Sequence, residues 1–159
     1  MKILGIDPGT SRIGFGFISD QPLTLITYGT IEIKEKSNKK FLLLSERMDE
    51  LIEELRPNAA AIEKIYFVKN QKTAIEVAQA RGIIMLSILK KGIPVSEYGP
   101  QEIKRSVTNY GLADKKSVAK LVGKLLNIND LKGYDDASDA LAIAITAANL
   151  LRYEKFNRG

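Results

Sequence analysis

Apolar and polar positions follow one another along the chain in blocks that predict three consecutive strands and then alternating helices and strands. Short apolar runs bounded by turn-forming residues predict strands over residues 3–6, 13–19, 23–33, 59–63 and 93–98. Apolar residues at helical spacing predict helices over residues 41–55, 73–89, 100–107, 115–126 and 136–153, before a short polar tail over 154–159. Because three strands precede the first helix, this order does not fit a doubly wound dinucleotide-binding fold. It predicts an α/β domain in which helices flank a five-stranded mixed sheet.

Small residues mark two places where elements approach each other closely. Gly14 and Gly16 lie on one face of the second predicted strand, which leaves room for something to approach that face closely. Ala74, Ala78 and Gly82 recur every fourth residue on the second predicted helix. This stripe could pack against the sheet or form a subunit interface, and the pattern alone favours packing against the sheet.

The amino-acid composition narrows the chemistry of any site. The chain of 159 residues has the length of one domain, residues 1–159, and contains no cysteine and no histidine. Disulfides, thiolate and imidazole metal ligands, and catalysis by histidine are therefore excluded. Carboxylates, carbonyls and water remain as metal ligands, and they favour hard cations such as magnesium or manganese.

Two features of the sequence bear on location. The chain begins Met1-Lys2 and enters a predicted strand directly, without an apolar signal segment. The longest apolar run, residues 140–145, is far too short to span a bilayer. We therefore expect a cytoplasmic protein with no membrane partner.

Acidic residues stand at the ends of predicted strands and at the start of the last helix. Asp7 ends the first strand, where it is equally typical of a turn before Pro-Gly, and Glu63 ends the fourth. If these strands are neighbours, the two carboxylates meet. Asp136 and Asp139 are three residues apart, and Asp135 and Asp139 four apart, so either pair shares a helical face.

Two interpretations of these acids remain open. Acids in a first helical turn also complement the helix dipole, which would give Asp136 and Asp139 a purely structural role. Gathered carboxylates, however, repel one another by about 4 kcal/mol per pair at about 4 Å and an effective dielectric of about 20. Divalent cations relieve this repulsion, and two such ions are the usual arrangement for in-line displacement at phosphorus.

Basic residues concentrate in one block of the chain. The net charge is +5, and residues 100–126 carry six basic and two acidic residues, and so +4 of it. This block is either a solvated helix face or a surface that contacts phosphates. Lys115 lies in a first helical turn, where the helix dipole also favours an anion. Elsewhere, Tyr66 and Phe67 follow Glu63 closely, and we assign Phe67 to the core and leave Tyr66 as core or as a side chain that stacks on an unpaired base.

Six segments occur in order along nearly the whole chain: GIDPGT (5–10), AIEKIYF (61–67), KN with AxxxxQARG (69–82), EY (97–98), QEIK to GLADK (101–115) and DASDALAIAIT (136–146). As an ordered set they resemble RuvC, the family of bacterial Holliday-junction resolvases. The resemblance implies a ribonuclease-H-like fold. It also implies a homodimeric, metal-dependent endonuclease that nicks two strands symmetrically at a four-way junction during recombination and repair.

The resemblance also implies roles for particular residues. It places the catalytic and metal-binding acids at Asp7, Glu63, Asp136 and Asp139, around two Mg²⁺ ions or, alternatively, Mn²⁺. It places the DNA contacts at Tyr66, Lys104 and Lys115, with Lys115 also catalytic, and we add Lys69 and Lys116 as further DNA contacts. The helix over 73–89 would contribute to the dimer, and RuvA and RuvB would be partners.

The sequence departs from the family pattern in two places. Tyr66 replaces the usual Phe, and Asp135 adds an acid beside Asp136, so either of these two acids remains a candidate ligand. Three other functions fit parts of the same pattern. A YqgF-type nuclease acting on another nucleic acid shares the strand-end Asp, but the QARG helix and the AIEKIYF segment argue against it. A sugar kinase or actin-like ATPase needs two such domains, and a junction-binding module without catalysis leaves the four acids unexplained.

Overall fold

The predicted strands form one five-stranded sheet with the spatial order β3-β2-β1-β4-β5. The computed structural model describes residues 1–65, 71–131 and 135–158. Its strands are β1 (Lys2–Asp7), β2 (Arg12–Asp20), β3 (Leu23–Glu32), β4 (Ala59–Glu63) and β5 (Val95–Tyr98). The first three strands are antiparallel neighbours, whereas β4 runs parallel to β1 and β5 runs parallel to β4. The predicted mixed sheet is therefore confirmed.

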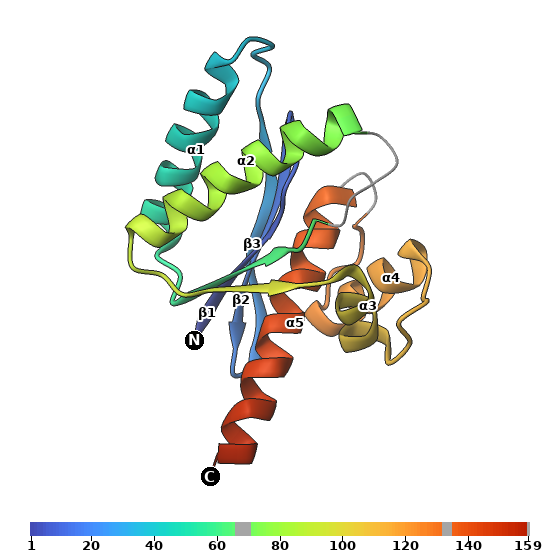
Figure 1. Ribbon diagram of the computed structural model, residues 1–159. Helices are drawn as coiled ribbons and strands as arrows, with labels where there is room; N and C mark the ends of the chain where they lie inside the picture. The colour runs from blue at the N-terminus through green and yellow to red at the C-terminus, as the bar shows by residue number, and fades with distance from the viewer. Residues whose placement is uncertain (66–70, 132–134, 159) are drawn as a thin grey trace.

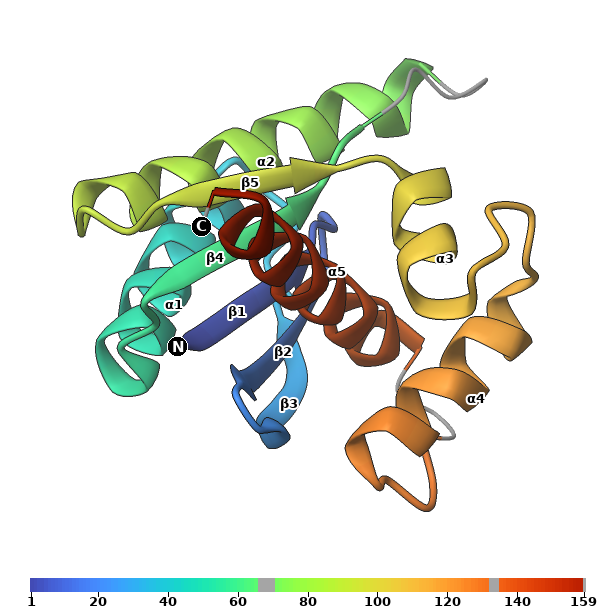
Figure 2. The same cartoon turned by 90° about the horizontal axis from the view of Figure 1, so that it is seen from below.

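Helices cover both faces of this sheet. They are α1 (Lys39–Leu55), α2 (Gln71–Lys90), α3 (Pro100–Thr108), α4 (Lys115–Leu126) and α5 (Asp135–Arg158). The helices α1 and α2 cover one face, while α5, with α3 and α4 beside it, covers the other (Figures 1 and 2). The prediction that the last helix ends at residue 153 is wrong, because α5 continues to Arg158 and no Gly or Pro interrupts its polar last turns. In the parts of the chain that the structure describes, no helix is long and apolar enough to cross a membrane.

The central strand β1 is buried on both faces, and its alternation determines where Asp7 points. Leu4 and Ile6 pack in the core beneath α1 and α2, whereas Ile3 packs in the core beneath α5, and all three are fully buried. Successive side chains of a strand point to opposite faces. Asp7 therefore shares the face of Ile3 and Gly5, which is the face that α5 covers.

Glycines on β1 and β2 allow α5 to lie directly on the sheet. A Cβ at Gly14 would overlap the backbone carbonyl of Asp136, and a Cβ at Gly16 would lie 2.7 Å from the backbone nitrogen of Leu141. Gly5 meets the backbone of the same helix at Ala140. The predicted close approach to the face of Gly14 and Gly16 is confirmed, and it brings the first turn of α5 next to the end of β1.

The small-residue stripe of α2 does not face the sheet. The sheet-facing side of this helix carries Ala80, Ile84 and Ile88, which are fully buried. Ala78 and Gly82 are exposed instead, and a Cβ at Gly82 would meet no atom within 4 Å. The interpretation that the pattern alone favoured, packing of the stripe against the sheet, is therefore wrong. Spacing by four residues identifies a helix face, but it does not tell which face meets the sheet.

Candidate active site

The carboxylates of Asp7 and Glu63 lie at the ends of adjacent parallel strands. The ladder between β1 and β4 pairs Ile6 with Ile62, so Asp7 and Glu63 follow one step further on. Both also point to the face beneath α5, because Glu63 alternates with the core residue Ala61. The first and fourth strands are neighbours, so the condition for the meeting of the two carboxylates is fulfilled.

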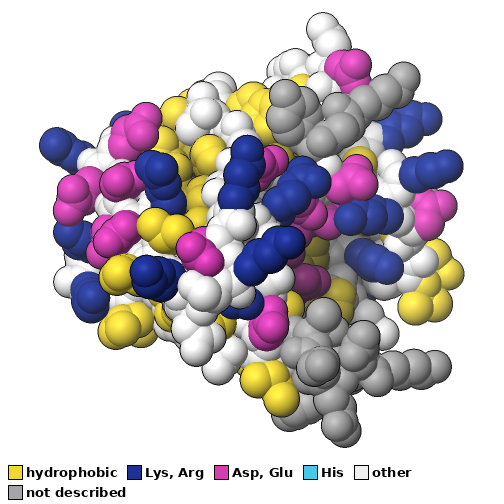
Figure 3. Space-filling model, turned by 90° about the horizontal axis from the view of Figure 1, so that it is seen from above, with side chains coloured by type: hydrophobic (Ala, Val, Ile, Leu, Met, Phe, Trp, Pro, Cys, Tyr) yellow, Lys and Arg dark blue, Asp and Glu magenta, His cyan; other side chains and the backbone are white. Residues whose placement is uncertain are grey.

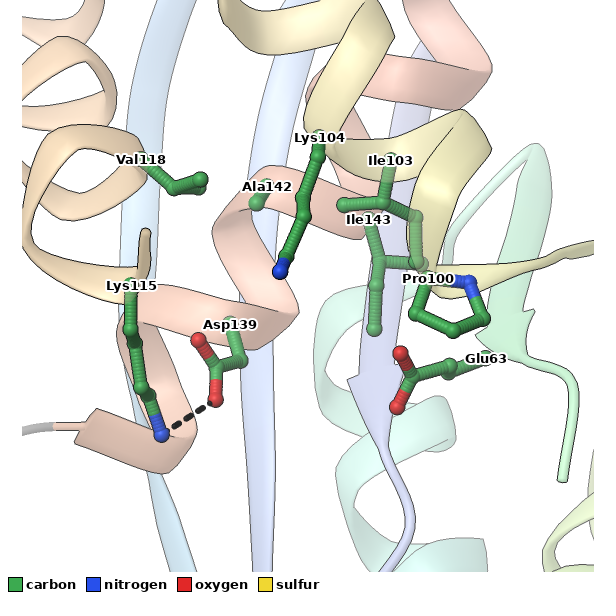
Figure 4. Close-up of a pocket in the computed structure, with 9 residues that line it drawn as sticks. All are labelled: Glu63, Pro100, Ile103, Lys104, Lys115, Val118, Asp139, Ala142 and Ile143. Carbon is green, nitrogen blue, oxygen red and sulfur yellow. Dashed lines mark ion pairs between the residues drawn. The ribbon is translucent and has the colours of Figure 1, made fainter. Parts of the chain in front are cut away.

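The first turns of α5 bring two more acids to this place. The antiparallel ladder pairs Asp7 with Gly14, and the backbone of Asp136 lies directly over Gly14. One turn further along the helix, Asp139 lines the same cavity as Glu63 (Figure 4). Three elements that are distant in sequence, β1, β4 and α5, therefore bring the four predicted acids to one end of the sheet.

The cavity that Glu63 and Asp139 line holds about 210 Å³ and has a charged and an apolar side. Its charged lining consists of Glu63, Asp139, Lys104 and Lys115, and the side chains of Glu63, Asp139 and Lys104 reach into the same hollow (Figure 4). Its apolar lining comes from α3, α4 and α5: Pro100, Ile103, Val118, Ala142 and Ile143. The apolar side limits the access of water to the carboxylates.

Burial and mutual repulsion raise the pKa of three of the acids. Burial, followed by the charges of Asp139, Glu63 and Asp136, raises the pKa of Asp7 from its usual 3.8 to about 7. Burial is also the largest cause that raises the pKa of Glu63 and that of Asp139, and Asp139 adds to the effect at Glu63. The site therefore holds more negative charge than it can stabilise alone, and it favours a proton or a cation.

Cationic side chains partly offset this charge. The Lys115 ammonium lies 2.8 Å from Oδ2 of Asp139, and this contact raises the pKa of Lys115. The charges of Lys115 and Lys104 partly offset the rise in the pKa of Glu63. In the view from above Figure 1, Lys and Arg side chains surround a group of Asp and Glu side chains on this surface (Figure 3). This distribution suits a negatively charged polymer that must approach an acidic centre.

Sequence reasoning missed one cation of the site. Nε of Arg12, the first residue of β2, lies 3.3 Å from Oδ2 of Asp136. Strand alternation could have found it, because Arg12 lies two residues before Gly14 and so shares the face that α5 covers.

The remaining predicted residues are not all part of this cluster. Lys116 lines a separate hollow of about 760 Å³ beside α4, together with Lys120 and Lys124. Asp135 is exposed, and its charge raises the pKa of Asp139 but, unlike the charge of Asp136, is not among the causes that raise the pKa of Asp7. Tyr66 and Lys69 lie outside the described residues.

The four acids supply the right donor atoms for a hard divalent cation, but their side chains are not closed around one. Among the described residues, no three acidic side chains form a ready-made metal site. Asp139 and Asp136 instead make ion pairs with Lys115 and Arg12. A donor set of carboxylate oxygens with raised pKa values nevertheless fits Mg²⁺ or Mn²⁺, because a bound cation would relieve the same repulsion.

The family model described as crossover junction endodeoxyribonuclease RuvC matches residues 3–147, which include all four acids. The chain belongs to the RuvC family. Its enzyme class is therefore that of a crossover junction endodeoxyribonuclease, and the family match favours RuvC over the YqgF-type interpretation.

Individual members of the RuvC family match along almost their whole length. The RuvC of Syntrophomonas wolfei is 41% identical over 98% of this chain and 93% of its own length. The RuvC of Thermotoga petrophila is 39% identical over 100% of this chain and 99% of its own. A solved structure of Thermus thermophilus RuvC in complex with a Holliday junction substrate superposes with a TM-score of 0.86, at 28% identity and 96% coverage of each chain. This likeness confirms the predicted ribonuclease-H-like fold.

Proposed function

We propose that this chain resolves four-way DNA junctions by paired, symmetric nicks in recombination and repair, through metal-dependent hydrolysis of phosphodiesters. The observation that carries this proposal is the convergence of Asp7, Glu63, Asp136 and Asp139 from three elements at one end of the sheet. The junction-bound structure of the Thermus thermophilus relative supports the choice of substrate.

The four acids would hold two divalent ions. When bound, such a pair activates a water and stabilises the leaving oxygen of an in-line displacement. Asp7 is the central ligand of the proposal, because Glu63 on the next strand and Asp136 and Asp139 on α5 all raise its pKa. Glu63 and the two acids of α5 would complete the two ligand sets. Lys115, paired with Asp139, would stabilise the charge that develops on the scissile phosphate.

Cations beside the cluster would bring the DNA backbone to it. Phosphates approaching four carboxylates are repelled unless lysines offset the charge, and Lys104 stands in the cavity itself. Lys116 would contact a phosphate further along α4, where it lines the neighbouring hollow. Lys69 and Tyr66 complete the proposed contacts, with the Tyr66 ring stacking on a base at the junction.

A two-fold dimer would place two such sites on the near-two-fold junction, so that both nicks follow from one docking event. The outward side of α2 supports its proposed role in this dimer. Ile75, Leu86 and Leu89 are 61%, 55% and 54% exposed there, near the exposed small residues Ala78 and Gly82. RuvA and RuvB are the proposed partners in branch migration.

Cleavage of labelled DNA tests this function. The protein is given a four-way junction or a matched duplex, with Mg²⁺ or with EDTA, alongside Asp7→Asn. The control is Glu54→Gln, which alters an exposed acid of α1. We expect paired nicks on the junction alone, dependent on the metal and on Asp7, with junction binding retained by Asp7→Asn and normal cleavage by Glu54→Gln.

Two outcomes would replace the proposal. Equal cutting of duplex and junction would make the chain a nuclease for another nucleic acid. Junction binding without metal-dependent cleavage would make it a binding module.

A further inference from the structure

Arg81 of α2 contacts both strands that fix the position of Glu63. Its Nε donates a hydrogen bond to the backbone carbonyl of Glu63 at 3.4 Å. Its Nη2 makes an ion pair with the carboxylate of Glu97 on β5. The Arg81 side chain is 21% exposed, so most of it is packed against neighbouring residues. Arg81 belongs to the QARG segment, and its partner Glu97 belongs to the EY segment. The proposed chemistry gives neither segment a role.

The contacts of Arg81 lie where the hydrogen-bonded ladder between β4 and β5 ends. The ladder between β4 and β5 pairs Ile62 with Glu97 and ends with Glu63 opposite Tyr98. The backbone N–H of Lys64 donates to the Tyr98 carbonyl at 2.8 Å. Among the described residues, no further pair of the β4–β5 ladder follows this bond, and Nε of Arg81 donates to the carbonyl of Glu63 from the α2 side.

We propose that Arg81 is a positioning residue, which fixes the backbone at Glu63 while Glu97 fixes the guanidinium. The inference rests on the proposed catalytic role of Glu63. The contact holds the Glu63 backbone in place against a repulsive force, because the charge of Asp139 repels the Glu63 carboxylate. Without the contact at its carbonyl, the end of β4 can turn that carboxylate away from the other acids. A displacement of about 1 Å at a reacting centre costs on the order of 100-fold in rate.

The location of Arg81 adds a second consequence. It lies on α2, whose outward side is the proposed dimer surface, and it lines a hollow of about 380 Å³ with Ala74, Ile75 and Ala78 of the same helix. Arg81 therefore connects the helix that carries the proposed dimer surface to the backbone of Glu63, the proposed metal ligand.

Arginine suits this role better than lysine. The planar guanidinium presents several donors in a fixed arrangement, so one side chain serves the Glu63 carbonyl and the Glu97 carboxylate together. A lysine keeps the charge beside Glu97 but offers a single ammonium to both acceptors. Arg81→Lys should therefore behave as an intermediate between the parent and Arg81→Met.

The test measures junction cleavage and junction binding separately. For Arg81→Met we expect kcat to fall by about 10- to 100-fold, with a higher Mg²⁺ concentration at half-maximal rate. We expect the junction Kd in EDTA to change by less than about twofold, because Arg81 is assigned no DNA contact. Arg81→Lys should recover part of the rate, and Glu97→Gln should lower kcat in the same direction. Arg47→Met removes an arginine from a surface ion pair of α1 and serves as the matched control.

Several results would overturn the inference. A parental rate and Mg²⁺ dependence in both Arg81→Met and Glu97→Gln would do so. A loss of junction binding by Arg81→Met in EDTA as large as its loss of cleavage rate would also overturn it, because Arg81 would then be a DNA contact. A lowered Tm in Arg81→Met with no recovery of rate in Arg81→Lys would make its role merely structural. Glu63→Gln, measured beside these variants, separates a failure of this inference from a failure of the proposed function. If Glu63→Gln cleaves at the parental rate, the proposed function itself fails.

Discussion

Replacing Asp7 by Asn should stabilise the metal-free protein while abolishing cleavage. The folded state raises the pKa of Asp7 to about 7 from its usual 3.8, so between these pH values the folded state holds a proton that the unfolded state has lost. Stability falls with rising pH wherever the folded state binds more protons. The charged Asp7 therefore lowers the free energy of unfolding progressively from about pH 4, and the full loss is present above about pH 7.

The pKa change sets the size of this effect. Each unit of pKa is worth about 1.4 kcal/mol, so raising the pKa of Asp7 from 3.8 to about 7 corresponds to at most about 4 kcal/mol. Asparagine keeps the shape but still buries a polar group, which lowers the gain. We expect Asp7→Asn to be about 2 kcal/mol more stable than the parent at pH 8, or about 4–8 °C in Tm.

Urea unfolding in EDTA at pH 4, 6 and 8 measures this difference, at one fixed protein concentration. The extra stability of Asp7→Asn over the parent should be absent at pH 4 and largest at pH 8. Mg²⁺ should reduce this difference, because it stabilises the parent alone. Glu54→Gln, which alters an exposed acid distant from the site, should stay within about 0.5 kcal/mol of the parent at every pH. An Asp7→Asn protein less stable than the parent at pH 8 would show that the acid cluster does not carry uncompensated charge.

Three further predictions follow from the same geometry. Gly14→Ala should lower the free energy of unfolding by about 1–3 kcal/mol and slow cleavage, because the added Cβ overlaps the backbone of Asp136. Gly82→Ala is the control and should not lower the free energy of unfolding, because its Cβ meets no atom within 4 Å. Equal losses of stability for the two variants in urea unfolding would contradict this prediction. Lys115→Met should slow cleavage by about 100-fold with little change in Tm, since the Lys115 side chain is 59% exposed, and a parental rate would remove it from the mechanism. The Mg²⁺ concentration for half-maximal cleavage should rise as the pH falls below about 7, because a proton on Asp7 competes with the metal, and a constant value from pH 6 to 8 would argue against Asp7 as a ligand.

The sequence was sufficient for those features that local pattern and chain order determine. Alternation and turn residues predicted the strands, and the glycines on one face of β2 predicted a close approach to that face, which α5 makes in the structure. The adjacency of Asp7 and Glu63 followed once the first and fourth strands were taken as neighbours.

Features that depend on long-range packing could not be predicted in this way. The stripe at Ala78 and Gly82 turned out to face outward, because the sheet-facing side of α2 is set by Ala80, Ile84 and Ile88. The role of Arg12 depends on strand register and on where α5 begins, and neither is visible in a short segment. Lys116 is a near neighbour of Lys115 in sequence but lines a different hollow.

If cleavage takes place at the four clustered carboxylates, the neighbouring acids Asp135 and Asp136 must differ sharply in their effect on it. Asp136 lies over Gly14 and adds to the raised pKa of Asp7, whereas Asp135 is exposed. The measurement is the single-turnover rate of junction cleavage in Mg²⁺ by Asp136→Asn and by Asp135→Asn, two isosteric changes one residue apart. We expect a loss of at least about 100-fold for Asp136→Asn and a rate within a few-fold of the parent for Asp135→Asn. Equal rates in the two variants, or a greater loss in Asp135→Asn, would show that Asp136 is not one of the catalytic carboxylates.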